Sequence, residues 1–227
     1  MKVLTKSIQT EEQIAEILAI LEKEVAGYAV PVVDLIAVQS NDPYRILIAA
    51  MLSARTLDQT TALAAARLFK AAPDLTTLAG LPEEEIIQLI YPVGFYRVKA
   101  RHLAELAAGL AGSGGRIPAT LDDLLTLPGV GRKTANLVLA VAFHQPAICV
   151  DTHVHRIVNI WGYVHTKTPL ATEMALRQKL PERFWQRINS ILVAFGQGTC
   201  RPLAPHCDRC IISNACPQIG VVPRKNR

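Results

Sequence analysis

The sequence predicts an all-α fold. Apolar residues recur at the three- and four-residue spacing of amphipathic helices along nearly the whole chain of 227 residues. We find no strict alternation typical of a half-buried strand, and no internal repeat of fixed period. Proline, glycine and helix-capping residues stand between the periodic segments, where helices are expected to begin and end.

The first predicted helix follows Thr10 and Gln13, which form a capping-box pattern. The second follows Asp42-Pro43, an N-cap and a proline suited to a first helical turn, and covers 44–54. Because this segment is apolar on most sides, it is expected to be buried in the centre of the fold.

Thr56 is a candidate N-cap for a third helix over 57–71. Pro92 and Gly94 end the helix that opens at Leu81-Pro82. The remaining predicted helices cover 95–110, 121–126, 132–143, 152–161, 170–180 and 182–197.

The composition is that of a globular protein, because half of the residues are hydrophobic and can form a sizeable core. No apolar run is long enough to span a membrane, and the polar N-terminus carries no secretory signal, so a cytoplasmic protein is expected. The net charge of +5 is compatible with binding to a polyanion such as nucleic acid. The aromatic content of 5% argues against a surface that mainly stacks single-stranded bases.

Four cysteines near the C-terminus have the spacing C-x6-C-x2-C-x5-C: Cys200, Cys207, Cys210 and Cys216. Zinc sites more often pair two short knuckles, whereas this segment has a single C-x2-C, so a 4Fe–4S cluster is favoured over zinc. Two disulfides are less favoured, because no secretory signal is present. Cys149 lies in an apolar run and is expected to be a buried core thiol.

The segment L-P-G-V-G-R-K-T-A at 127–135 separates two predicted helices. Its glycines permit positive φ and close backbone approach, so N–H groups of Gly129, Val130 and Gly131 can face a phosphate beside the next helix N-terminus. Such a hairpin binds a duplex backbone without reading its sequence. The alternative is an ordinary helix–helix turn followed by a surface lysine, Lys133.

Lys133 and Asp151 are candidate catalytic residues. Lys133 lies in the first turn of a helix, where the dipole disfavours a second positive charge and a nearby phosphate would offset that effect. A lysine amine can attack an electrophilic sugar carbon and form a Schiff base. Asp151 is expected to cap the next helix, and a carboxylate there would also stabilise a cationic sugar or relay protons.

Taken together, these segments resemble the endonuclease III family of DNA glycosylases, in the helix-hairpin-helix superfamily. The resemblance extends over roughly residues 10–217. The blocks that carry it are L-P-G-V-G-R-K-T-A at 127–135, V-D-T-H at 150–153, the four-cysteine loop at 200–216, G-F-Y-R-V-K-A at 94–100 and L-S-A-R-T at 52–56.

The resemblance implies two helical lobes with a DNA cleft between them. One is a six-helix barrel over 35–146, with the helix-hairpin-helix motif at about 121–143. The other joins 1–34 to 147–227 and carries the 4Fe–4S cluster in the loop 200–216, with the four cysteines as its ligands. The cluster is expected to hold this loop rather than to do redox work.

The function implied is that of a bifunctional enzyme of base-excision repair. It would remove oxidised pyrimidines from double-stranded DNA and nick the abasic site by β-elimination, working as a monomer on damaged duplexes. Lys133 corresponds to the nucleophile of the family and Asp151 to its essential carboxylate.

Further residues are implied to contact DNA. Arg55 and Phe95 stand at the two positions that fill the gap left by an extruded base, where family members often carry glutamine and leucine. For Phe95 the alternative is a core aromatic. The remaining candidates are His153 and three residues of the cysteine loop, Arg201, His206 and Arg209; for these three the alternative is a solvated basic surface.

Rival functions remain open at this stage. A glycosylase of the same superfamily for alkylated or mismatched bases would differ in its pocket, and mismatch enzymes tend to lack the lysine. A non-catalytic DNA-binding module would use the hairpin as a phosphate clamp, without a need for Lys133 and Asp151. A small electron-transfer protein would not need a helical body of roughly 200 residues.

Overall fold

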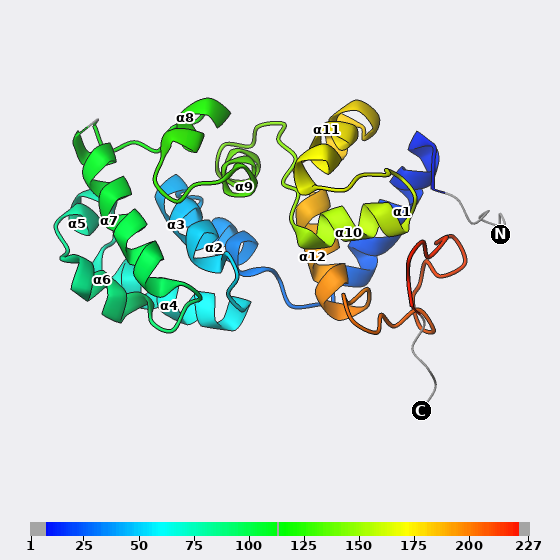
Figure 1. The fold of residues 1–227 in the computed structure, drawn as a ribbon, viewed down its shortest axis with the longest axis horizontal. Helices are drawn as coiled ribbons and strands as arrows, with labels where there is room; N and C mark the ends of the chain where they lie inside the picture. The colour runs from blue at the N-terminus through cyan, green and yellow to red at the C-terminus, as the bar shows by residue number, and fades with distance from the viewer. Residues whose placement is uncertain (1–7, 113, 223–227) are drawn as a thin grey trace. The chain divides into compact units, whose positions relative to one another are not determined.

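The computed structural model describes residues 8–112 and 114–222, and it confirms the all-α prediction. No strand occurs within these residues (Figure 1). The polar N-terminus and the basic tail 223–227 lie outside them. The helices are α1 Glu11–Val25, α2 Val32–Ser40, α3 Pro43–Ser53, α4 Asp58–Ala71, α5 Leu75–Ala79, α6 Glu83–Ile90, α7 Tyr96–Gly112, α8 Leu121–Thr126, α9 Arg132–Ala142, α10 Thr152–Ile160, α11 Pro169–Lys179, the 3₁₀ segment η1 Glu182–Phe184 and α12 Ile188–Gly198.

The chain divides into two compact units. The central unit is Pro31–Ala147 and contains α2 to α9. The terminal unit joins the residues up to Val30 to those from Ile148 onward, and it contains α1, α10, α11, η1, α12 and the cysteine loop. Within the described residues, no helix is both long and apolar enough to cross a membrane.

Helix α3 forms the core of the central unit, as its apolar sequence predicts. Its residues from Ile46 to Leu52 are all buried, and it packs against α2, α4, α7 and α9. Helix α9 is buried along most of its length, from Thr134 to Ala140. Because α9 packs against α3, the hairpin leads directly into a helix of the core of this unit.

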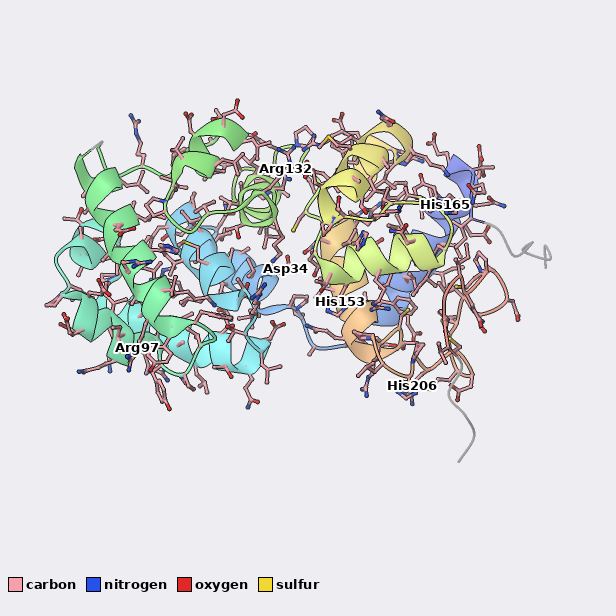
Figure 2. All side chains as sticks on the ribbon, viewed as in Figure 1. Asp34, Arg97, Arg132, His153, His165 and His206 are labelled. Carbon is pink, nitrogen blue, oxygen red and sulfur yellow. The ribbon has the colours of Figure 1, made fainter. Side chains whose placement is uncertain are left out.

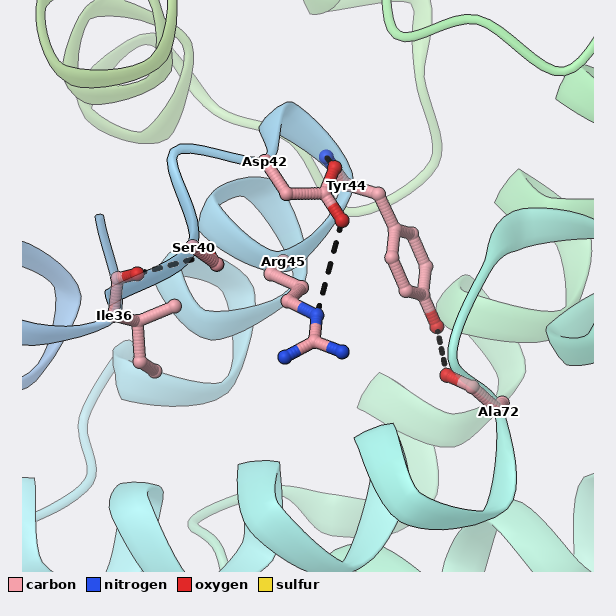
Figure 3. Close-up of polar contacts among 6 residues, drawn as sticks. All are labelled: Ile36, Ser40, Asp42, Tyr44, Arg45 and Ala72. Atoms are coloured by element: carbon pink, nitrogen blue, oxygen red, sulfur yellow. Dashed lines mark hydrogen bonds and ion pairs between the residues drawn. The ribbon is translucent and has the colours of Figure 1, made fainter. Parts of the chain in front are cut away.

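The start of α3 is held by polar contacts (Figure 3). Asp42 is its N-cap, and its Oδ1 accepts a hydrogen bond from the Tyr44 backbone N–H at 2.9 Å. The buried Tyr44 hydroxyl donates to the Ala72 carbonyl at 2.8 Å, which joins α3 to the end of α4. Ser40, the last residue of α2, donates its hydroxyl to the Ile36 carbonyl at 2.9 Å.

The prediction that Thr56 caps the third helix is wrong. Helix α4 begins at Asp58, and its N-cap position is Leu57, which makes no side-chain capping bond. The Thr56 hydroxyl instead donates to the Ala54 carbonyl at 3.3 Å and accepts from the Gly94 N–H at 3.1 Å. A tertiary contact with a residue 38 positions away therefore takes the hydroxyl that a local reading assigned to the helix end.

Two short helices, α2 and α5, were not predicted. Helix α2 follows Pro31, which offers no side-chain cap, and its first N–H, from Val32, is instead 3.4 Å from Oδ2 of Asp58 in α4. Helix α5 has five residues, too few for a helical period to show, although Asp74 caps it through the Thr77 N–H at 2.7 Å.

The helix predicted over 182–197 is divided in the structure. A 3₁₀ turn, η1, precedes α12, which begins only at Ile188. The Trp185 N–H donates to the Glu182 carbonyl at 2.9 Å, and its indole Nε1–H donates to the Leu180 carbonyl at 2.8 Å. The indole N–H needs an acceptor, and its bond to the Leu180 carbonyl together with the backbone bond to Glu182 keeps this segment in a tight turn.

The terminal unit has its own core, built from α1, α10 and α12. Thr10 and Gln13 form the predicted capping box at the start of α1. Large side chains such as Trp161, Tyr163 and Phe195 are almost fully buried between these helices. The cysteine loop packs on this core through Ile212 and Cys216.

Candidate functional site

The hairpin between α8 and α9 has the backbone that its glycines predict. Gly129 has φ +75°, in the left-handed region, and a Cβ there would lie 2.6 Å from Nδ1 of His102 in α7. The Val130 N–H closes the turn by donating to the Leu127 carbonyl at 3.1 Å, and the Val130 side chain is buried. The turn is therefore pinned to the helix core on its inner side.

The outer side of the hairpin is the start of α9. Gly131 occupies the N-cap position and supplies no side-chain cap, and a Cβ at this residue would meet nothing within 4 Å. Arg132 and Lys133 are the first two residues of α9 (Figure 2 labels Arg132). Helix N-terminal N–H groups beside two cationic side chains suit a bound anion such as a phosphate.

Arg55 and Phe95 lie side by side in the central unit. The Arg55 guanidinium carbon is 5.5 Å from the centre of the Phe95 ring, and Phe95 is 61% exposed, so it is not a core aromatic. Both residues have positive φ, +53° for Arg55 and +58° for Phe95. Gly94 allows the two turns to meet, because a side chain there would collide with the Arg55 carbonyl oxygen.

Lys99 is a residue of this site that the sequence reasoning missed. It lies on α7, and its ammonium group donates to the carbonyls of Leu52 and Ala54, each at 2.7 Å, and to the Thr56 hydroxyl at 3.2 Å. Burial lowers its pKa to about 8. The sequence could have indicated this, because Lys99 is four residues before Leu103 and so lies on the apolar face of its own helix.

Asp151 caps α10 in the terminal unit, as its position predicts. Its Oδ1 accepts a hydrogen bond from the Val154 N–H at 2.8 Å, and the residue is half-buried. The cap uses one of the two carboxylate oxygens. The same local geometry fixes the direction of the carboxylate at the beginning of α10.

His153 and Arg156 lie one helical turn apart on α10. His153 packs so closely on α12 that a side chain at Gly196 would collide with its ring (Figure 2). Arg156 Nη2 donates to the Cys200 carbonyl at 2.6 Å, and Nη1 lies 3.5 Å from the Cys200 Sγ. The sequence analysis assigned no role to Arg156, although its i, i+3 spacing from His153 places both on one helix face.

The four C-terminal cysteines line one cavity of the terminal unit. Apolar side chains of Trp161, Phe195 and Ile212 complete its walls. None of the chain's five cysteines is in a disulfide, and Cys149 is buried as predicted. Within the described residues, no three His, Cys, Asp or Glu side chains are grouped closely enough to hold a single metal ion. The lining thiols are Cys200, Cys207, Cys210 and Cys216.

The surroundings of these thiols change their pKa. Burial, with smaller contributions from the neighbouring cysteines, raises the pKa of Cys210 and of Cys216 to about 11. Such thiols are protonated at neutral pH, and a bound metal centre would displace their protons, because thiolates are the metal-binding form. A donor set of four sulfurs around one apolar cavity fits an iron–sulfur cluster.

The basic residues of the cysteine loop have different roles in the structure. Arg201 is exposed, and its Nε–H lies 3.2 Å from the Gln197 carbonyl and 3.1 Å from the Gly198 carbonyl, so it caps the C-terminal end of α12. The His206 N–H donates to the Thr199 carbonyl at 3.0 Å (Figure 2 labels His206). Arg209 is exposed.

Comparison with known proteins identifies the family. Residues 48–182 match the family model described as HhH-GPD superfamily base excision DNA repair protein. The endonuclease III of Thermotoga maritima is 46% identical over 179 residues, which are 78% of this chain and 84% of that protein. The chain belongs to the endonuclease III family.

Solved structures of endonuclease III agree with this assignment. A non-covalent endonuclease III–DNA complex has a TM-score of 0.82 at 33% identity, covering 92% of this chain and 96% of that one. A trapped covalent intermediate of endonuclease III with DNA has a TM-score of 0.80 at 32% identity, again covering 92% of this chain and 96% of that one. The resemblance inferred from the sequence motifs is thereby confirmed, and so is the expectation of a base-excision-repair protein with a helix-hairpin-helix motif.

Proposed function

We propose that this endonuclease III family member is a bifunctional DNA glycosylase that removes oxidised pyrimidines and then cleaves the abasic site. The observation that carries the proposal is Lys133 in the first turn of α9, directly behind the hairpin formed by Gly129 and Gly131. A lysine amine in this position could act as a nucleophile close to backbone N–H groups suited to a phosphate, which supports the proposal. A pure phosphate clamp would need only the hairpin.

In the first step, the lone pair of Lys133 Nζ forms a bond to C1′ of the extruded nucleotide while the glycosidic bond breaks. The bonding electrons leave with the base, which takes up a proton. Asp151 stabilises the positive charge that develops on the sugar, and it accepts the proton that the amine releases. The nitrogen lone pair then breaks the C1′–O4′ bond, and O4′ takes up a proton, so the product is an iminium ion that joins Lys133 to the ring-opened sugar.

In the second step, a base removes a proton from C2′ of the iminium-linked sugar. The resulting electron pair forms the C2′–C3′ double bond as the 3′ phosphate leaves, so the strand is nicked 3′ to the lesion. Water then hydrolyses the imine and frees Lys133. The protonated imine makes the C2′ proton acidic, which explains why one lysine supports both steps.

The proposed DNA contacts follow from exposure. Gly129, Val130 and Gly131 offer the backbone of the hairpin to a phosphate, and Arg55 with Phe95 fills the space of the extruded base. Arg201 and Arg209 are exposed on the cysteine loop and suit further phosphates. His153 packs on α12 and its Nδ1 lies 3.4 Å from Nη2 of Arg156, so we propose that it acts on DNA binding indirectly, through Arg156. We also propose that the enzyme works as a monomer on duplex DNA.

The cofactor proposed is a 4Fe–4S cluster held by Cys200, Cys207, Cys210 and Cys216, because these thiols share one cavity. When bound, the cluster supplies cross-links that hold the loop 200–216. Arg156 contacts Cys200 through both its carbonyl and its sulfur, so it joins the loop to α10, the helix that Asp151 caps.

Borohydride trapping tests the proposal, with one duplex that carries thymine glycol and another that carries an abasic site. The wild-type protein should form a covalent adduct with both, and Lys133→Gln with neither. Arg132→Gln, which removes the neighbouring charge but not the nucleophile, should weaken duplex binding by no more than about tenfold and retain the adduct. An adduct on the abasic duplex alone would keep the lyase step and reject the oxidised-pyrimidine substrate. Persistence of both adducts in Lys133→Gln would reject Lys133 as the nucleophile.

A further inference from the structure

Lys99 is a buried lysine, and burying a charged ammonium group costs free energy. It is only 8% exposed, and it belongs to α7, whose buried face also carries Ala100 and Leu103. Burial lowers its pKa to about 8. A buried ammonium persists when several acceptors satisfy it, and a methionine or leucine would pack there without that cost. The contacts of the ammonium group therefore indicate what the lysine does.

All three acceptors of Lys99 lie in one short stretch, the last turn of α3 and the residues that follow it. Two are the carbonyls of Leu52 and Ala54, and the third is the Thr56 hydroxyl. A cation at the C-terminal end of a helix is favoured by the helix dipole, and the last carbonyls of α3 need partners. Because the acceptors are 43 to 47 residues away in sequence, Lys99 fixes this turn to the start of α7.

The two segments that Lys99 joins carry Arg55 and Phe95. Each residue has positive φ, a conformation that a side chain disfavours and that persists only when its surroundings impose it. A second contact acts in the same direction, since the Thr56 hydroxyl also accepts from the Gly94 N–H at 3.1 Å. The exposed guanidinium of Arg55 and the ring of Phe95 are thus held against each other by contacts that lie beneath them in the protein interior.

We propose that Lys99 is a positioning residue that holds Arg55 and Phe95 together as one preformed wedge, ready to fill the gap left by an extruded nucleotide. The inference rests on the proposed glycosylase function, and it adds a residue that would not touch the DNA. Without the ammonium group, the turn at Arg55 and the start of α7 would be joined by the Thr56–Gly94 hydrogen bond but no longer by the three bonds of Lys99. The wedge would then have to be ordered each time a base is extruded, which slows base release more than it weakens binding.

The test is a double-mutant cycle between Lys99→Met and Phe95→Ala. Methionine keeps most of the buried volume and removes the ammonium. The single-turnover rate of base release at thymine glycol should fall about tenfold or more in Lys99→Met, as expected for lost hydrogen bonds to a charged group. Affinity for the undamaged duplex should stay within about twofold. In the Phe95→Ala background, the same substitution should cost less than about twofold, because the wedge is already lost.

Two control variants separate positioning from general stability. Lys179→Met removes another lysine that donates to a backbone carbonyl, Tyr163 at 2.8 Å, but in the terminal unit. It should lower the melting temperature without changing the ratio of base release to duplex binding. Thr56→Ser keeps the hydroxyl acceptor and should retain the wild-type rate, whereas Thr56→Val should lose part of it.

The outcomes distinguish the inference from the function on which it rests. A wild-type enzyme that releases thymine glycol, with Lys99→Met as fast, would overturn the inference and leave the proposed function intact. Equal losses from Lys99→Met with and without Phe95 would overturn it too, because Lys99 would then act through folding alone. A wild-type protein without base release or trapping would reject the proposed function, and the inference with it.

Discussion

Gly129→Ala would press a methyl group against α7. The residue has φ +75°, and the new Cβ would lie 2.6 Å from Nδ1 and 2.9 Å from Cβ and Cγ of His102. The left-handed backbone costs about 1 to 2 kcal/mol for a residue with a side chain. Displacing the base of the histidine side chain costs about 1 to 3 kcal/mol more, as in other overpacked interiors.

The expected loss is therefore about 2 to 5 kcal/mol in the free energy of unfolding. Urea denaturation followed by circular dichroism measures it. Gly131→Ala is the matched control, because Gly131 has φ −94° and a Cβ there would meet nothing within 4 Å. That variant should lose under about 1 kcal/mol, the difference between glycine and alanine at an N-cap. It should still weaken duplex binding if a phosphate approaches this backbone.

A second substitution tells the two costs apart. His102→Ala removes Nδ1 and Cγ but keeps the Cβ at 2.9 Å, so it should restore part of the loss that comes from the collision and none of the loss that comes from φ. The reasoning fails if Gly129→Ala is as stable as the wild type. It also fails if Gly131→Ala loses as much stability as Gly129→Ala, because the two glycines differ in the structure both in backbone angle and in surroundings.

Three further predictions concern other parts of the molecule. The pKa of Lys99 is about 8 in the folded protein and 10.5 in the unfolded chain, so between these pH values the ammonium proton is bound in the unfolded chain and lost in the folded one. The wild-type free energy of unfolding should therefore rise with pH relative to that of Lys99→Met between pH 8 and 10.5. The rise should reach at most about 3 kcal/mol, and a constant difference across this window in urea titrations would contradict it. Tyr44→Phe should lower stability by about 1 kcal/mol through loss of the bond to the Ala72 carbonyl, with trapping of abasic DNA unchanged. Cys210→Ser should remove the visible absorbance of the purified protein while Cys149→Ser keeps it, and absorbance retained in Cys210→Ser would reject that ligand.

Much of the fold was predictable because its signals are local. The capping box at Thr10, the Asp42-Pro43 start of α3 and the Asp151 cap of α10 each act within four residues. Helical periodicity acts over the same range, so most helix positions followed from it. The Gly-x-Gly hairpin was readable for the same reason, since a positive φ at Gly129 is a property of that residue in its turn.

The errors arose where a side chain bonds across the fold. Thr56 reads as a helix cap, but its hydroxyl is taken by Gly94 and Lys99. The start of α2 has no cap of its own, and its first N–H faces Asp58. These partners are 26 to 43 residues apart in sequence, beyond the range of any local pattern.

The sequence by itself determined the helical class, the family, and the presence of a lysine, a carboxylate and four thiols in a recognisable order. The tertiary structure decided which of the remaining polar groups work together: Lys99 beneath Arg55 and Phe95, and Arg156 against Cys200. The physical reason is the range of the interactions. Capping and periodicity are settled within one or two helical turns, whereas a buried charge takes whichever acceptors the packed chain brings within hydrogen-bonding distance.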